Sequence, residues 1–233
     1  FNCYCKPFDE LNKWFISDLR DGFIYIATDF ASAESDPDNI VVSKQLRGLV
    51  FVFGSRTLEP YQNVGGTGFP YERVNSGIYN KGCAAPFSVV ECNNALYFIG
   101  RGKRERPGIW VTNGGPPQKV STASIDNLIF KGGIDPISNA WAIQWGDKGD
   151  SFIQFTIPTV CTVVYNLANG LWFTKESVDS NLNPQPSRIT SMVDAYSVLL
   201  VGDQISGNIG IYSDDYYYEY GQEIRSYFTT API

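Results

Sequence analysis

Short apolar runs, each followed by a polar turn and a second run, recur along the whole chain. The apolar runs read LVFVFG (49–54), ALYFIG (95–100), DSFIQF (150–155) and SVLLVG (197–202). Gly54 and Gly100 lie 46 residues apart, and Gly202 follows Gly100 after 102 residues, which is two steps of 51. Repeats of roughly 40 to 50 residues built from hairpins are typical of β-propeller blades.

Each apolar run is followed by a partner run, which predicts a hairpin. The partners read EPYQNVG, GIWVT, TVVYNLANG and GNIGIYS, and Asn169-Gly170 is a two-residue hairpin signal. A hairpin can bury one face only against another sheet, so four or five such units are expected to stack. The sequence therefore predicts one all-β, β-propeller-like domain of antiparallel sheets over residues 1–233. A β-sandwich is the alternative, and the repeat period ranks it second.

The segments around these repeats carry local signals of their own. Residues 14–19 (WFISDL) and 23–27 (FIYIA), joined by Asp-Gly, predict a further hairpin. Residues 121–129 predict one short helix, capped by Ser121 or Thr122 and with its apolar residues at helical spacing. Residues 177–187 read as a polar loop, and residues 223–230 as a last strand.

Composition agrees with an all-β chain. Hydrophobic residues make up 43% of the sequence and charged residues 18%, and 15 Phe, 14 Tyr and 5 Trp supply many residues that favour strands. This balance argues against disorder and against a coiled coil. No apolar run approaches the roughly 20 residues that a membrane-spanning helix needs, so no membrane partner is expected.

The net charge of −6, from 18 basic and 24 acidic residues, repels phosphate on average. Broad coating of nucleic acid is therefore not expected. The single methionine is Met192, and Phe1 opens inside an alternating, strand-like run. From this we expect the sequence to be an internal fragment of a longer chain.

The absence of histidine removes several kinds of catalytic and metal site. Ser-His-Asp and Cys-His pairs, histidine bases and histidine metal ligands are all impossible without it. The glycine cluster at 65, 66 and 68 lacks the spacing of a dinucleotide fingerprint, and no phosphate-binding loop occurs. The five cysteines contain no C-x-x-C pair, and we expect them to be reduced, small buried residues: Cys3, Cys5, Cys83, Cys92 and Cys161. Zinc would need cysteines alone or cysteines with carboxylates, and no metal or cofactor is predicted.

Paired carboxylates are the remaining candidates for chemistry, because glycoside hydrolysis uses two of them. Asp147 and Asp150 flank a Lys-Gly turn, where side-chain hydrogen bonding within the turn explains them better. The second group alternates with tyrosines: Asp214, Asp215, Tyr216, Tyr217, Tyr218, Glu219 and Tyr220. It fits a sugar-binding face, and it fits an exposed strand better.

The densest positive charge lies in one predicted hairpin tip, at Arg101, Lys103, Arg104 and Arg106, interrupted by Glu105. Such a tip could bind a phosphate or the acidic surface of a partner. A solvated tip is the simpler interpretation, since loops carry charge by default.

Several phrases, in their order and spacing, resemble a known family. These are WFISDL, the stretch 35–65 containing LVFVFGSRTLEPYQNVG, GIYNKGCAAPF (77–87), LYFIGRG and STASIDNLI. Together they are similar to the packaged-DNA stabilisation proteins of short-tailed bacteriophages, the tail accessory or hub factors. The resemblance runs from Trp14 to the closing IGIYS and FTTAP, but the tyrosine-rich run and the basic tip have no counterpart in it.

The resemblance implies a structural virion protein rather than an enzyme. Members of that family form a ring of six copies below the portal and its adaptor, extend the tail tube, support the needle and tailspikes, and retain packaged DNA. It implies contact with passing DNA without sequence-specific binding, and a location in the virion tail after assembly in the host cytoplasm. A carbohydrate-binding or carbohydrate-cleaving propeller is the alternative function, and a cellular scaffold propeller is a third.

Overall fold

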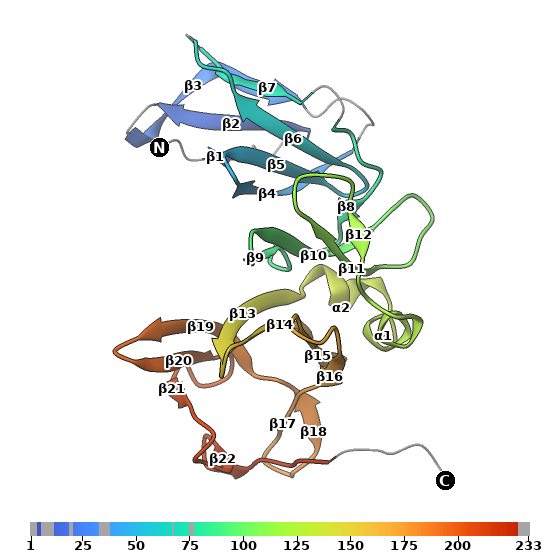
Figure 1. Ribbon diagram of the computed structural model, residues 1–233, viewed down its shortest axis with the longest axis vertical. Helices are drawn as coiled ribbons and strands as arrows, with labels where there is room; N and C mark the ends of the chain where they lie inside the picture. Colours follow the sequence, from blue (N-terminus) through green and yellow to red (C-terminus); the bar gives the residue numbers. More distant parts are fainter. Residues whose placement is uncertain are drawn as a thin grey trace. The chain divides into compact units, whose positions relative to one another are not determined.

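A computed structural model describes residues 4–5, 12–18, 21–32, 38–66, 68–74 and 77–227. The chain divides into two compact units, Phe1–Phe130 and Lys131–Ile233. Within the described residues the secondary structure consists of antiparallel sheets and two short helices (Figure 1). In this part of the chain, no helix has the length and apolar character needed to span a bilayer.

Unit 1 contains three of the sheets. The first has the order β1-β2-β3, with β1 (Tyr4–Cys5), β2 (Lys13–Asp18) and β3 (Asp21–Ser32). The second is a meander of β4 (Ile40–Leu46), β5 (Leu49–Gly54), β6 (Leu58–Asn63) and β7 (Tyr71–Arg73). The third joins β8 (Gly82–Cys83), β9 (Val90–Cys92), β10 (Ala95–Arg101), β11 (Gly108–Thr112) and β12 (Gln118–Lys119), followed by α1 (Ala123–Ile129).

Unit 2 begins with α2 (Ile134–Ser138) and two meanders. One contains β13 (Trp141–Asp147), β14 (Asp150–Ile157), β15 (Cys161–Asn166) and β16 (Trp172–Thr174). The other contains β19 (Ile189–Ala195), β20 (Val198–Asp203) and β21 (Ile209–Tyr212). Two small hairpins complete the unit: β17 (Glu176–Val178) with β18 (Pro184–Pro186), and β22 (Tyr218–Glu219) with β23 (Gln222–Glu223).

The repeat predicted from the sequence is confirmed. The four apolar runs are β5, β10, β14 and β20, and each is an inner strand, paired on both sides by antiparallel neighbours. The predicted all-β class of repeated, propeller-like antiparallel sheets is therefore the observed one. Inner strands are nearly continuous apolar runs because both faces of their sheet meet other side chains.

Alternation along β5 shows how one strand supports two cores. Val50 and Val52 point into a cluster with Trp14 and Ile16 of the first sheet. Phe51 and Phe53 point the other way, into a cluster with Leu96 and Phe98 of the third sheet. The rings of Phe53 and Phe98 meet edge to face, with centroids 4.9 Å apart. Unit 1 is thus a stack of sheets in which the β4–β7 sheet is covered on both faces.

The glycines that set the repeat period are positions of close approach. A Cβ at Gly54 would lie 2.3 Å from Oδ2 of Asp38, and one at Gly202 would lie 2.4 Å from Oγ of Ser191. Because neither distance leaves room for a methyl group, the backbone itself approaches a polar side chain at the end of both inner strands.

Three local predictions need correction. Residues 134–138 form a second helix, α2, whereas the sequence predicted only one helix. Pro136 lies in the first turn of α2, where its missing N–H is not required. Residues 177–187 are not a plain loop, because β17 pairs with β18, and an edge strand tolerates prolines. The last strand is only Gln222–Glu223 and residues 224–227 are not strand, while 228–230 lie outside the described residues.

The helix and the two hairpins that the sequence predicted elsewhere are present. Helix α1 begins after Thr122, whose side-chain oxygen accepts a hydrogen bond from the N–H of Ile125. Strands β2 and β3 pair as a hairpin, but Asp21 and Gly22 belong to β3 and not to the loop between the strands. Strands β15 and β16 also pair, and Asn169-Gly170 lies between them, but the connection spans residues 167–171 and is not a two-residue turn.

Candidate functional site

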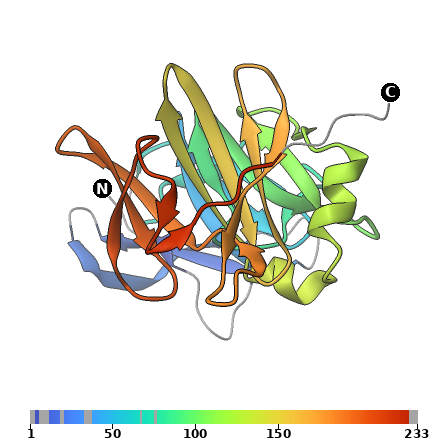
Figure 2. The same cartoon turned by 90° about the horizontal axis from the view of Figure 1, so that it is seen from below.

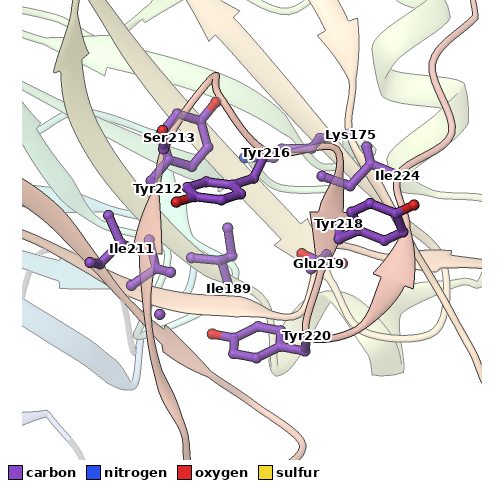
Figure 3. Close-up of a pocket in the computed structure, with 12 residues that line it drawn as sticks. Lys175, Ile189, Ile211, Tyr212, Ser213, Tyr216, Tyr218, Glu219, Tyr220 and Ile224 are labelled. Carbon is purple, nitrogen blue, oxygen red and sulfur yellow. The ribbon is translucent and has the colours of Figure 1, made fainter.

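The tyrosine-rich run lines a cavity in unit 2 (Figure 3). The cavity has a volume of about 260 Å³, and its floor includes Ile189 and Val201 from the sheet β19-β20-β21. Figure 3 shows side chains of four tyrosines around Ile189, at positions 212, 216, 218 and 220. The remaining lining residues are Lys175, Gly210, Ile211, Ser213, Glu219 and Ile224.

A tight hairpin holds the tyrosine run in place. Strands β22 and β23 are joined by Tyr220 and Gly221, with φ of 46° and 86°. Two consecutive positive φ values are the geometry of a type I′ turn, which matches the twist of a two-stranded ribbon. The chain after β23 continues along residues 174–176 (Figure 2). The hydroxyl of Tyr227 donates a hydrogen bond to Glu176 at 3.2 Å.

Lys175 brings a buried amine to this cavity. Its Nζ lies 4.5 Å from the ring centroid of Tyr212 and 5.4 Å from that of Trp145. It is shielded from solvent and has no hydrogen-bond partner among the described residues. Burial lowers the pKa of Lys175 to about 8, and the charge of Glu219 opposes this shift. Sequence reasoning missed this residue.

Tyr220 is fixed by an ion pair behind it. The guanidinium of Arg188 lies 4.6 Å from the centre of the Tyr220 ring and donates two hydrogen bonds, both 2.6 Å, to the carboxylate of Asp203. Those bonds are the main reason that the pKa of Asp203 lies far below its usual range. The hydroxyl of Tyr220 is buried and has no partner in the described part of the chain, and burial raises its pKa. Arg188 and Asp203 were also missed by sequence reasoning.

The candidate carboxylates do not gather at the cavity. Asp147 and Asp150 face each other across the β13–β14 turn, where Asp150 accepts a hydrogen bond from Asn166 at 2.9 Å. Asp214 forms an exposed ion pair with Lys148 of that turn, and Asp215 accepts from Ser213. Glu219 is the one carboxylate that lines the cavity. The arrangement suits binding of a polar ligand, with one acidic and one basic group in an aromatic setting.

The basic tip of the β10–β11 hairpin is mostly solvated. Lys103 and Arg104 are exposed, while Arg106 lies 5.4 Å from the Phe130 ring and donates to Asn127 at 3.4 Å. Glu105 pairs with Lys81. Arg101 is half-buried at the end of β10. Lys103, Arg104 and Arg106 are therefore all exposed at the tip, and within the described part of the chain Arg106 is the one of these three that contacts neighbouring side chains.

The cysteines behave as small buried residues where their side chains are described. Cys83 and Cys92 are buried and Cys161 is half-buried, and all three are free thiols. Burial raises the pKa of Cys83 and of Cys161 to about 11. Side chains of Cys3 and Cys5 lie outside the description. Within the described ranges, no three histidine, cysteine or acidic side chains are grouped to hold a metal ion.

Comparison with known proteins gives three findings. The family model described as "Phage_stabilise: Bacteriophage P22 Gp10, beta-propeller" matches residues 8–217. The "Tail hub protein gp10" of Salmonella phage P22 is 30% identical over 137 residues, which cover 54% of this chain and 28% of that protein. The crystal structure of the computationally designed Ika4 protein has a TM-score of 0.38 at 10% identity, covering 78% of this chain and 94% of the designed one. The chain thus spans less than a third of the length of its phage relative, and the family description names the first of the two predicted architectures.

Proposed function

Because the chain belongs to the phage stabilisation family typified by P22 gp10, a β-propeller family, we propose that it is a structural protein of a short phage tail. The family match over residues 8–217 is the observation that carries this proposal, and the similarity to a tail hub protein supports it. The proposed role is mechanical, without catalysis.

In the proposed assembly, several copies, six by resemblance to the family, form a ring below the portal and its adaptor. The ring extends the tail tube, supports the needle and tailspikes, and keeps packaged DNA from leaking. It assembles in the host cytoplasm and remains in the virion tail.

Physical properties of the chain support this role. A net charge of −6 disfavours a tight grip on DNA phosphates, which would hinder DNA passage through a ring. Sheets covered on both faces, such as β4–β7, are stiff elements. Strand β3 lies at the edge of its sheet as described and exposes Phe23, Ile24, Tyr25 and Ile26, which is typical of a surface that partners cover.

The basic tip remains a candidate for one of these contacts. Exposed Lys103 and Arg104 would meet an acidic surface of a neighbouring protein. A K103E/R104E variant is then expected to enter particles more slowly, while K44E/K131E, which reverses two exposed lysines elsewhere, is not. Equal incorporation of both variants removes the tip from the interface.

The test of the main proposal is a phage particle made without this protein. In the phage that carries this coding sequence, heads lacking the protein are expected to package DNA, lose it on storage and acquire no tail. Nuclease-protected DNA and electron microscopy of purified particles measure both effects. Particles that keep their DNA and complete their tails would falsify the proposal.

A sugar-cleaving enzyme is the second candidate function, and the cavity with Glu219 is the feature that favours it. Glycoside hydrolysis requires a second carboxylate across the substrate, and neither Asp214 nor Asp215 lines the cavity. Cleavage of host surface polysaccharide by the purified chain, lost in E219Q, would establish this alternative. No cleavage by the parent protein excludes it.

A further inference from the structure

We propose that the cavity beneath the tyrosine hairpin is a binding site for one neutral sugar ring. The inference goes beyond the tail function, because it concerns a ligand site inside unit 2 and not the assembly of the particle. It rests on unsatisfied polar groups, on the apolar and aromatic walls, and on the size of the cavity.

Two residues that line the cavity each carry a buried polar atom without a hydrogen-bond partner among the described residues. Nζ of Lys175 is a hydrogen-bond donor, and the hydroxyl of Tyr220 can donate or accept. Leaving such groups unsatisfied costs about 1–3 kcal/mol each. A ligand whose hydroxyl groups reach both atoms would satisfy them at once.

Glu219 adds an acceptor to the same cavity. It influences the pKa of Lys175 through charge, yet no ion pair forms between the two side chains. The cavity therefore offers one acidic acceptor and one basic donor that do not satisfy each other. Hydroxyl groups donate to the first and accept from the second, which a purely cationic or purely anionic ligand cannot do.

The walls suit the carbon skeleton of a sugar. Ile189, Val201 and Ile211 supply aliphatic surface. Tyr216 and Tyr218 also line the cavity, and these residues are 71% and 66% exposed. Exposed aromatic rings with polar ends provide apolar area that packs on the C–H face of a sugar while the hydroxyl stays hydrated. Figure 3 shows these rings and Lys175 around the same space.

Size and charge narrow the ligand class. Pockets for drug-sized ligands span roughly 300–1,000 Å³, so a cavity of about 260 Å³ suits a single ring. Lys175 disfavours a cationic ligand, and Glu219 disfavours a carboxylate. A neutral, polyhydroxylated ring meets neither repulsion.

In the experiment, the purified full chain is titrated with methyl glucoside, methyl galactoside and methyl N-acetylglucosaminide. Binding is measured from changes in the NMR signals of the tyrosine rings. Acetate and trimethylammonium are the charged comparison probes. At least one neutral glycoside is expected to bind saturably with a dissociation constant of about 1 mM, which fits a ligand of this size. Y220F, which removes one oxygen and keeps the ring, and K175M are each expected to weaken binding about tenfold.

Matched controls lie outside the cavity. Y196F changes a tyrosine that is 94% exposed, and K148M changes an exposed lysine of the β13–β14 turn. Both are expected to bind like the parent chain. The proposal is overturned by absence of saturable binding, by Y220F and K175M binding as tightly as the parent chain, or by saturation with acetate or trimethylammonium alone. None of these results bears on tail assembly, so the two proposals fail separately.

Discussion

Two turns at equivalent places in the repeat, one in each unit, are each fixed by a buried aspartate. In unit 1, Asp38 lies before β4 and reaches the β5–β6 turn. Its carboxylate accepts hydrogen bonds from the backbone N–H groups of Ser55, Arg56 and Thr57 at 2.9, 2.6 and 2.8 Å. No cation pairs with it among the described residues.

In unit 2 the corresponding aspartate belongs to the inner strand itself. Asp203 ends β20 and accepts hydrogen bonds from the N–H groups of Ile205 and Ser206 at 3.2 and 2.8 Å. Arg188 donates two more hydrogen bonds to the Asp203 carboxylate. In both units an aspartate carboxylate accepts hydrogen bonds from the N–H groups of the turn. The comparison shows that a different part of the chain supplies this aspartate in each unit.

The two units also differ in how the faces of their sheets are covered. The β4–β7 sheet of unit 1 is closed by apolar side chains on both faces. The β19–β21 sheet of unit 2 shares a smaller apolar cluster with β13 and β15, and it also forms the floor of the cavity that holds Lys175. In unit 2 the β19–β21 sheet therefore lines a polar cavity, whereas both faces of the β4–β7 sheet in unit 1 pack against apolar side chains.

The largest expected loss of stability comes from replacing Arg188, the cation that pairs with the turn aspartate of unit 2. R188M leaves the Asp203 carboxylate buried without its partner, and we expect a loss of about 3–5 kcal/mol in the free energy of unfolding. Urea denaturation measures it, and R188M/D203N is expected to recover most of the loss. A loss below about 1 kcal/mol in R188M would show that Asp203 needs no cation.

The second-largest loss of stability is expected in the unit 1 turn. D38A removes the acceptor of three backbone N–H groups, of which that of Thr57 is buried, and we expect a loss of about 2–3 kcal/mol together with faster hydrogen exchange at residues 55–57. D179A is the control, because Asp179 accepts similar backbone bonds in an exposed loop. Unchanged exchange at 55–57 would contradict the role of Asp38.

The repeat glycines sharpen the comparison further. In G54A the new methyl group meets a carboxylate held by several hydrogen bonds, so we expect a loss of about 2 kcal/mol. In G202A it meets the hydroxyl of Ser191, which can rotate away, so the loss should be smaller. G115A, with no close neighbour, is the control. Thermal unfolding of the three variants ranks them, and G202A falling below G54A would reverse the interpretation.

The smallest effect concerns the lysine of unit 2 and depends on pH. The pKa of Lys175 is about 8 in the folded chain and 10.5 when unperturbed, so the charged amine destabilises the fold below pH 8. The pKa difference corresponds to about 3 kcal/mol. Because K175M also loses the contact of the amine with the Tyr212 ring, its net gain at pH 7 is expected to be about 1 kcal/mol. Between pH 8 and 10.5 only the unfolded state holds that proton, so the parent chain gains stability relative to K175M.

Urea denaturation of both chains across that pH range measures the difference. Other groups with shifted pKa values, such as Cys161, are present in both chains and cancel in the comparison. A constant difference between the chains from pH 7 to 10.5 would mean that Lys175 has an ordinary pKa.

The tyrosine run shows how far the sequence reaches toward the candidate site. The alternation of tyrosines and acids identified Glu219 and Tyr216 as candidates for a sugar-binding face, and both line the cavity. Lys175 and Arg188 carried no such signal, because each is a lone basic residue far from the run in sequence. Asp214 was grouped with Glu219 by proximity in sequence, and the β13–β14 turn binds it instead.

The sequence by itself determined the repeated sheets, the inner strands and most turns. These follow from local rules: alternation of side chains along a strand, the backbone freedom of glycine and asparagine in tight turns, and the capping of α1 by Thr122. Only the tertiary structure decided which aspartate fixes which turn, and that Lys175 is buried. Burial and long-range hydrogen bonds depend on which sheets pack together, and residues distant in sequence supply the atoms that meet there.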